Sequence, residues 1–139
     1  MLVKEMMTPN PHTIESKKTI QDALLLMYQH DIRRLPVMDG NMLIGIVSDR
    51  DIKQVIGRPP LGVGSANETE LTHSILGVMT HNAVTVHQDA DIRQAIELMA
   101  ENKFSGLPVM NHDQQLVGII SALDILRYTL DLLDRVEGK

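Results

Sequence analysis

An internal repeat constrains the fold of this chain more than any other feature. A shift of 72 positions superimposes residues 7–38 on residues 79–110, and a shift of 73 superimposes residues 43–52 on residues 116–125. Eighteen identical pairs share this register, with one residue inserted in the second copy, and unrelated halves do not produce such order. A repeat of this length indicates one supersecondary unit built twice. The longest match is Leu35-Pro36-Val37-Met38 with Leu107-Pro108-Val109-Met110, and Gly45-Ile46 also matches Gly118-Ile119.

Each copy carries the same predicted order of elements, β-α-β-β-α. In the first copy a short β-prone step at Thr13-Ile14 precedes a helix, for which Thr19 and Asp22 form a capping-box pattern. Residues 35–47 predict a β-hairpin with a polar turn, and a second helix is expected to begin at Ser48. The counterparts in the second copy are Thr85-Val86, the N-cap Asp91, a hairpin with a longer turn at residues 111–114, and Ser121.

The composition between the copies is that of a linker. Gly57 to Asn67 is rich in Pro, Gly and small residues, which hold neither a helix nor a central strand. We therefore divide the chain into a first repeat (1–57), an exposed mobile linker (58–73) and a second repeat (74–139) with an extended last helix, from about Ser121 to Val136. That helix carries an apolar stripe, which we assign to the core near its start and to an intersubunit surface near its end. The stripe consists of Leu123, Leu126, Leu130 and Leu133.

The bulk composition excludes several classes of function. A net charge of −5 argues against a nucleic-acid partner, which needs a basic face. The absence of Cys excludes disulfides, thiol catalysis and cysteine-based zinc sites. The six His lack the spacing of a helical metal pair, and the chain carries no catalytic constellation and no phosphate-binding glycine loop. Because no apolar run is long enough to cross a bilayer, we expect a cytoplasmic protein without a membrane or metal partner.

The two copies resemble a tandem pair of CBS domains, a Bateman module. The resemblance rests on an apolar-Pro strand start and a Gly-apolar-apolar-Ser-x-x-Asp element in each copy, and it covers nearly the whole chain. The segments that carry it are Arg33-Arg34-Leu35-Pro36-Val37, Gly45-Ile46-Val47-Ser48-Asp49-Arg50-Asp51, Ser105-Gly106-Leu107-Pro108-Val109 and Gly118-Ile119-Ile120-Ser121-Ala122-Leu123-Asp124.

The resemblance implies an α/β fold in which two β-α-β-β-α repeats pack about a pseudo-twofold axis. It also implies two clefts between the repeats, which in this family commonly bind AMP, ADP, ATP or S-adenosylmethionine. Such modules commonly form homodimers and regulate a protein partner. Short stand-alone members include acetoin-utilisation-type proteins, and no motif here decides whether this chain is one.

The Ser-x-x-Asp elements allow two compatible interpretations. Ser48 and Ser121 can cap the following helix, with Asp51 and Asp124 completing a capping box. A carboxylate also suits two adjacent hydroxyl groups, and the resemblance implies that these elements bind a ribose. Gly45 and Gly118, inside the preceding strands, indicate close approach of either another backbone or a ligand.

Arg33 and Arg34 are the expected phosphate ligands, with Arg34 preferred, because the family often places this position near phosphates and guanidinium matches phosphate oxygens. They could equally be solvated charges near Asp31. The second copy has Ser105-Gly106 instead, so the two clefts should differ in ligand preference. Secondary phosphate candidates are Arg50, Lys53 and Arg127.

The resemblance alone implies which residues frame the adenine. With few aromatic residues, the base would lie between aliphatic side chains and contact backbone groups. The framing residues would be Thr13, Ile14, Leu35, Pro36, Thr85, Val86, Leu107 and Pro108. The resulting hypothesis is a non-enzymatic regulatory module that senses adenosine-type ligands and requires no cofactor; the alternative is a constitutive interaction or oligomerisation module with no bound nucleotide.

Overall fold

The computed structural model describes residues 1–56 and 71–138, which form two compact units. One unit combines the first 11 residues with the chain from Val84 onward, and the other spans His12 to Ala83. The predicted α/β fold with two β-α-β-β-α repeats is confirmed, and each unit is described by itself below. The predicted linker at 58–73 falls largely outside the described residues.

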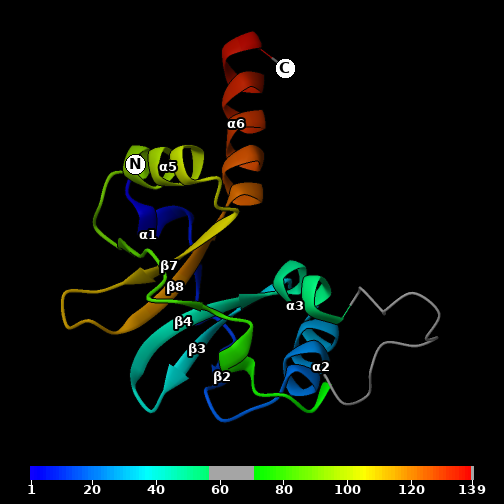
Figure 1. The fold of residues 1–139 in the computed structure, drawn as a ribbon. Helices are drawn as coiled ribbons and strands as arrows, with labels where there is room; N and C mark the ends of the chain where they lie inside the picture. Colours follow the sequence, from blue (N-terminus) through cyan, green and yellow to red (C-terminus); the bar gives the residue numbers. More distant parts are fainter. Residues whose placement is uncertain (57–70, 139) are drawn as a thin grey trace. The chain divides into compact units, whose positions relative to one another are not determined.

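The unit that contains the first repeat is a four-stranded sheet with the order β2-β3-β4-β5 (Figure 1). β2 runs parallel to β3, whereas β3-β4 and β4-β5 are antiparallel. Its elements are β2 (Ile14–Glu15), α2 (Ile20–His30), β3 (Arg34–Asp39), β4 (Met42–Ser48), α3 (Asp49–Ile56), η1 (Ile75–Gly77) and β5 (Thr80–His81).

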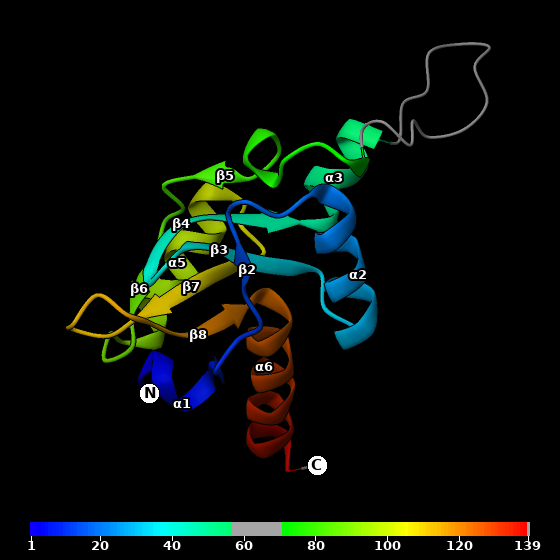
Figure 2. The same cartoon turned by 90° about the horizontal axis from the view of Figure 1, so that it is seen from below.

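The unit that contains the second repeat has the equivalent topology, with the strand order β1-β8-β7-β6. Both hairpins carry a register irregularity at the same place, between Val37 and Met38 and between Val109 and Met110. Its elements are α1 (Val3–Met6), β1 (Thr8–Pro9), β6 (Val86–His87), α5 (Ile92–Asn102), β7 (Gly106–Met110), β8 (Leu116–Ser121) and α6 (Ala122–Glu137). Figure 2 shows α6 extending well beyond β8, the strand from which it begins.

The predicted helix starts are confirmed. The Thr19 hydroxyl accepts a hydrogen bond from the Asp22 N–H at 3.2 Å, and the Asp22 carboxylate accepts one from the Thr19 N–H at 2.9 Å. Asp91 caps α5 by accepting from the Arg93 N–H at 2.8 Å. Each of these bonds satisfies an N–H group that the first helical turn leaves without a partner.

Each unit has its own aliphatic core between the sheet and its helices. In the first-repeat unit, Ile20 and Ala23 of α2 pack with Leu35 and Val37, which alternate along β3 and share one face of the sheet. The second-repeat unit repeats this arrangement, and its buried residues are Val3, Val86, Ala95, Met99, Leu107, Val109 and Ile120.

The first segment of each repeat belongs to the sheet of the other repeat. The Val3 N–H donates to the Ala90 carbonyl at 2.9 Å, and the equivalent Ile75 N–H donates to the Lys18 carbonyl at 3.1 Å. β1 then pairs with β8, and β5 pairs with β4. The compact units therefore divide the chain differently from the sequence repeats, because the short elements at residues 3–9 and 75–81 are exchanged.

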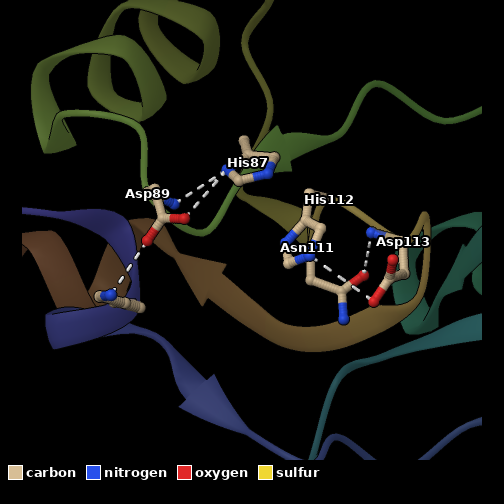
Figure 3. Close-up of polar contacts among 6 residues, drawn as sticks. His87, Asp89, Asn111, His112 and Asp113 are labelled. Carbon is tan, nitrogen blue, oxygen red and sulfur yellow. Dashed lines mark hydrogen bonds and ion pairs between the residues drawn. The ribbon is translucent and has the colours of Figure 1, made fainter.

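An ion pair supports the exchanged N-terminal segment. The Lys4 ammonium lies 3.0 Å from the Asp89 carboxylate, in the loop before α5. This contact holds the pKa of Asp89 below its usual range, chiefly through the hydrogen bond from Lys4 and despite some desolvation. Asp89 also lies close to His87 at the end of β6 (Figure 3).

The two strand glycines are explained by this exchange. A Cβ on Gly45 would lie 2.5 Å from the Thr80 carbonyl oxygen, and a Cβ on Gly118 would lie 2.9 Å from the Thr8 carbonyl oxygen. Of the two open interpretations, close approach of another backbone accounts for both positions.

Candidate functional site

The first Ser-x-x-Asp element lies where β4 ends and α3 begins. The Asp51 N–H donates to the Ser48 hydroxyl at 3.0 Å, and the Ser48 N–H donates to Asp51 Oδ2 at 3.3 Å. Both residues are half-buried. The predicted capping box is therefore present, and it fixes the carboxylate at the first turn of the helix.

The second element has the same geometry at the junction of β8 and α6. The Asp124 N–H donates to the Ser121 hydroxyl at 3.2 Å. Asp124 Oδ2 accepts from the Ser121 N–H at 2.9 Å and from the Ser121 hydroxyl at 2.8 Å.

In both elements the cap occupies one carboxylate oxygen. Within residues 1–56 and 71–138, every hydrogen bond to the carboxylates of Asp51 and Asp124 reaches Oδ2, and none reaches Oδ1. An ionised carboxylate has further acceptor capacity on both oxygens. Capping and ligand binding can therefore occur together, as the sequence allowed.

Arg34 is the first residue of β3 and lies directly opposite Ser48 in the hairpin. The carbonyl of its neighbour Arg33 accepts from the Asp49 N–H at 2.8 Å, so both residues adjoin the first turn of α3. Arg33 is exposed and Arg34 is half-buried. The counterpart of Arg34 in the second unit is Gly106, which pairs with Ser121 and provides no charge.

The secondary phosphate candidates differ in their surroundings. Lys53 lies 3.6 Å from Asp49 one turn earlier in α3, so it already has an anionic neighbour. Arg50 is exposed in the first turn of α3. Arg127 is exposed on α6, one turn beyond Asp124.

Most of the adenine-framing candidates lie in the cores. Ile14, Leu35, Val86 and Leu107 are buried in the clusters of their own units, and only their backbone could contact a base. Thr13 is exposed and Thr85 is half-buried, so their side chains remain accessible. Pro36 and Pro108 are fully buried.

Two histidine arrangements were not predicted. The rings of His12 and His30 stack with centroids 3.7 Å apart, and the His87 Nδ1 accepts from the Asp89 N–H at 3.1 Å (Figure 3). His12 and His30 are 18 positions apart and meet only because the segments around β2 and α2 fold together, so no local sequence pattern predicts this contact. Across the described ranges, no group of three or more His, Asp or Glu could hold a metal ion.

The comparisons with protein families identify both repeats. The family model of the CBS domain matches residues 3–58 and 75–131. A CBS domain-containing protein of Dictyostelium discoideum is 31% identical over 140 residues, covering 98% of this chain and 96% of that protein. Enzymes also match over a part of their length. Inosine-5'-monophosphate dehydrogenase of Methanocaldococcus jannaschii is 29% identical, and the match covers 22% of that enzyme.

Solved structures agree with the fold. A protein described as a putative acetoin utilization protein from Vibrio cholerae is 31% identical with a TM-score of 0.79, covering all of this chain and 97% of that one. The CBS domain pair of protein MJ0100, in complex with 5'-methylthioadenosine and S-adenosyl-L-methionine, is 28% identical with a TM-score of 0.79 and covers 93% and 95% of the two chains. CBSX2 in complex with AMP is 28% identical with a TM-score of 0.78 and covers 94% and 97%. No helix in the described part of this chain is long and apolar enough to span a membrane.

Proposed function

The chain belongs to the CBS domain family, and we propose that it is a regulatory module that binds adenosine-containing ligands and has no catalytic role of its own. The observation that carries this proposal is the paired Ser-x-x-Asp geometry. Two half-buried carboxylates are each held by a cap through Oδ2, and Oδ1 makes no bond within the described chain. Each is thus pre-organised to accept hydrogen bonds from the two hydroxyls of a ribose.

The ligands of similar proteins support this choice of ligand class. The CBS pair of MJ0100 was solved with 5'-methylthioadenosine and S-adenosyl-L-methionine, and CBSX2 was solved with AMP. These three ligands share an adenosine moiety and differ in the 5' substituent, which is a neutral methylthio group, a sulfonium-linked amino acid or a phosphate. A ribose-binding carboxylate serves all three, so the 5' substituent must be distinguished by other residues.

We assign that distinction to Arg34 and Arg33. Arg34 is opposite Ser48, beside the first turn of α3, where helix N–H groups and a guanidinium both favour an anion. Gly106 holds the equivalent position in the other unit and cannot neutralise a phosphate. A phosphorylated ligand should therefore prefer the site at Asp51, and an uncharged or cationic adenosine derivative should prefer the site at Asp124. Arg50 and Lys53 are secondary phosphate contacts in this proposal.

Binding of the ligand would act by differential affinity for two states of the module, and a protein partner would recognise the state that the ligand favours. Thr13 and Thr85 provide side-chain contacts to the base. The buried Ile14, Leu35, Val86 and Leu107 contribute their backbone groups, and Pro36 and Pro108 contribute their carbonyls.

The test is isothermal titration calorimetry with AMP, ADP, ATP and S-adenosylmethionine on the wild type and on Asp51→Ala, Asp124→Ala and the double variant. We expect each single variant to lose one binding event and the double variant to lose both. Asp22→Ala is the matched control, because it removes the same kind of capping carboxylate from α2 but should leave ligand affinity unchanged.

Unchanged affinity in the double variant would refute the ribose assignment. If none of the four ligands binds or raises the unfolding temperature of the wild type at high concentration, the module does not sense adenosine ligands. The alternative, a constitutive interaction module, would then be favoured.

A further inference from the structure

Two exposed imidazole rings stack on each other in the first-repeat unit. The ring centroids of His12 and His30 are 3.7 Å apart, and the ring planes are inclined to each other by 16°. Within residues 1–56 and 71–138, neither side chain makes a hydrogen bond or an ion pair. The polar edges of both rings can therefore interact with a ligand.

The stack lies at the end of the sheet where β3 begins. β2 runs parallel to β3 with Ile14 opposite Val37, so His12, which precedes Ile14 by two residues, lies toward the start of β3. His30 is the last residue of α2, and β3 begins four residues later at Arg34. Because the two rings are in contact, both lie near the start of β3.

The proposed phosphate contacts lie at the same end of the unit. Arg34 is opposite Ser48, and the Arg33 carbonyl accepts a hydrogen bond from the Asp49 N–H at 2.8 Å. Figures 1 and 2 both show α2 and α3 side by side at this end of β3 and β4. The histidine stack therefore shares one end of the sheet with the two arginines and with the helical turn that carries Asp51.

Two stacked imidazoles take up a first proton more easily than a second. An ordinary imidazole is protonated below about pH 6.5, whereas two imidazolium ions with ring centroids 3.7 Å apart would repel each other. Interacting groups of this kind lose their protons in two separate steps. Under mildly acidic conditions the pair therefore carries about one positive charge.

The charged groups around the stack do not by themselves favour that proton. Glu15, Lys17 and Lys18 lie toward the opposite end of β3, because β2 runs away from its start. Tyr28 of α2 remains neutral in this pH range. The near groups are the carboxylates of Asp31, Asp49 and Asp51 and the cations of Arg33, Arg34, Arg50 and Lys53.

A bound phosphate would change this balance of charge. It adds about two negative charges and so favours a proton on the histidine pair. By thermodynamic linkage, that proton strengthens the binding of the phosphate to the same extent. The second repeat cannot respond in this way, because Val84 and Asn102 hold the positions equivalent to His12 and His30 and neither titrates.

We propose that the His12–His30 pair forms part of the phosphate-binding end of the Asp51 site, where one proton on the pair strengthens the binding of a 5'-phosphorylated adenosine. The pair is thus a specificity-determining element that increasingly favours the phosphorylated ligand over adenosine as the pH falls. This inference rests on the proposed function, because it assumes that Asp51 binds the ribose.

The test is calorimetric titration of adenosine and of adenosine 5'-sulfate into the Asp124→Ala variant, which retains only the Asp51 site. The sulfate ester keeps its single negative charge throughout the range in which histidine titrates, whereas a phosphate monoester changes its own charge at about pH 6. We expect the ratio of the affinity for the sulfate ester to the affinity for adenosine to rise by about fivefold between about pH 8 and about pH 5.

Replacement of both rings should remove this pH dependence. With His12→Gln and His30→Gln added together to the Asp124→Ala variant, we expect the same ratio at every pH. Circular dichroism verifies that the fold is retained, which the exposure of both histidines favours. His73→Gln in the same background is the matched control, because His73 is exposed at the opposite end of α2, where its carbonyl accepts from the Ile20 N–H at 3.0 Å. It should keep the pH dependence.

Three outcomes would overturn this inference and leave the ribose assignment intact. They are a ratio that does not change with pH in the Asp124→Ala variant, a pH dependence that survives the replacement of both rings, and a pH dependence that His73→Gln abolishes. If the Asp124→Ala variant binds neither ligand, the ribose assignment at Asp51 fails, and this inference fails with it.

Discussion

The Thr80 carbonyl oxygen lies so close to the backbone of Gly45 that a Cβ on Gly45 would be 2.5 Å from that oxygen. Gly45 pairs with His81 in the sheet, so the obstructing atom belongs to the backbone of a neighbouring strand, which cannot turn aside as a side chain can. We expect Gly45→Ala to lower the free energy of unfolding by about 1–3 kcal/mol through overpacking. Urea denaturation measures this change in the free energy of unfolding.

Gly77→Ala is the matched control, because no heavy atom lies within 4 Å of its Cβ position. The lower entropy of the unfolded chain should make Gly77→Ala neutral or stabilising. A loss of stability from Gly77→Ala as large as that from Gly45→Ala would mean that the close approach of Thr80 is not the cause. Gly118→Ala should behave like Gly45→Ala, since the Thr8 carbonyl crosses it in the same way.

The exchange of short segments predicts which sheet a core substitution destabilises. Val3 is fully buried in the core of the second-repeat unit with residues of β7 and β8, although it belongs to the first repeat in sequence. We expect Val3→Ala to speed amide hydrogen exchange in β7 and β8 more than in β3 and β4, because a local cavity lowers the cost of local opening.

Ile75→Ala provides the reciprocal experiment. Ile75 is fully buried in the core of the first-repeat unit. Its replacement by Ala should therefore speed amide hydrogen exchange in β3 and β4 more than in β7 and β8. Faster exchange in the hairpin of the same sequence repeat, after either substitution, would contradict the exchanged arrangement.

The capping box of α2 predicts a pH-dependent stability. Hydrogen bonds from the Thr19 backbone and hydroxyl lower the pKa of Asp22 below its ordinary value of 3.8. Because the folded pKa is lower than the unfolded one, the stabilisation is present above the unfolded pKa and is lost as pH falls through the folded pKa. Asp22→Asn should cost about 1 kcal/mol near neutral pH, and progressively less below pH 3.8.

Chemical denaturation at a series of pH values measures this dependence. Gln21→Ala, at the exposed neighbouring position, is the control and should show no such convergence with the wild type. A constant difference between wild type and Asp22→Asn down to the lowest pH would show that Asp22 does not stabilise the fold through its charge.

The difference between the two proposed sites predicts a change in ligand preference. Arg34→Gln retains a polar side chain that can donate hydrogen bonds but removes the charge, so the ratio of AMP to adenosine affinity at the Asp51 site should fall by about tenfold. Calorimetry with both ligands gives the ratio. Arg34→Lys should retain part of the preference, since the charge remains without the planar fork. An equal loss of affinity for AMP and for adenosine would indicate a structural role for Arg34.

The repeat and its local elements could be predicted from the sequence because their signals are local. The caps at Thr19, Asp91 and Ser121 depend on residues two or three positions away, and the apolar spacing of α2 depends on helical periodicity alone. The Ser-x-x-Asp elements belong to the same class, so their position at strand–helix junctions was correctly predicted.

The tertiary structure decided what no local signal contains. The match of Met7-Thr8 with Met79-Thr80 indicated that these segments are equivalent, but only the fold showed that each joins the sheet of the other repeat. The partner of a short strand is set by long-range hydrogen bonds and burial, and a two-residue strand carries too few side chains to specify them. For the same reason the sequence left two explanations open for Gly45. The close approach of the Thr80 carbonyl favours contact with another backbone over contact with a ligand.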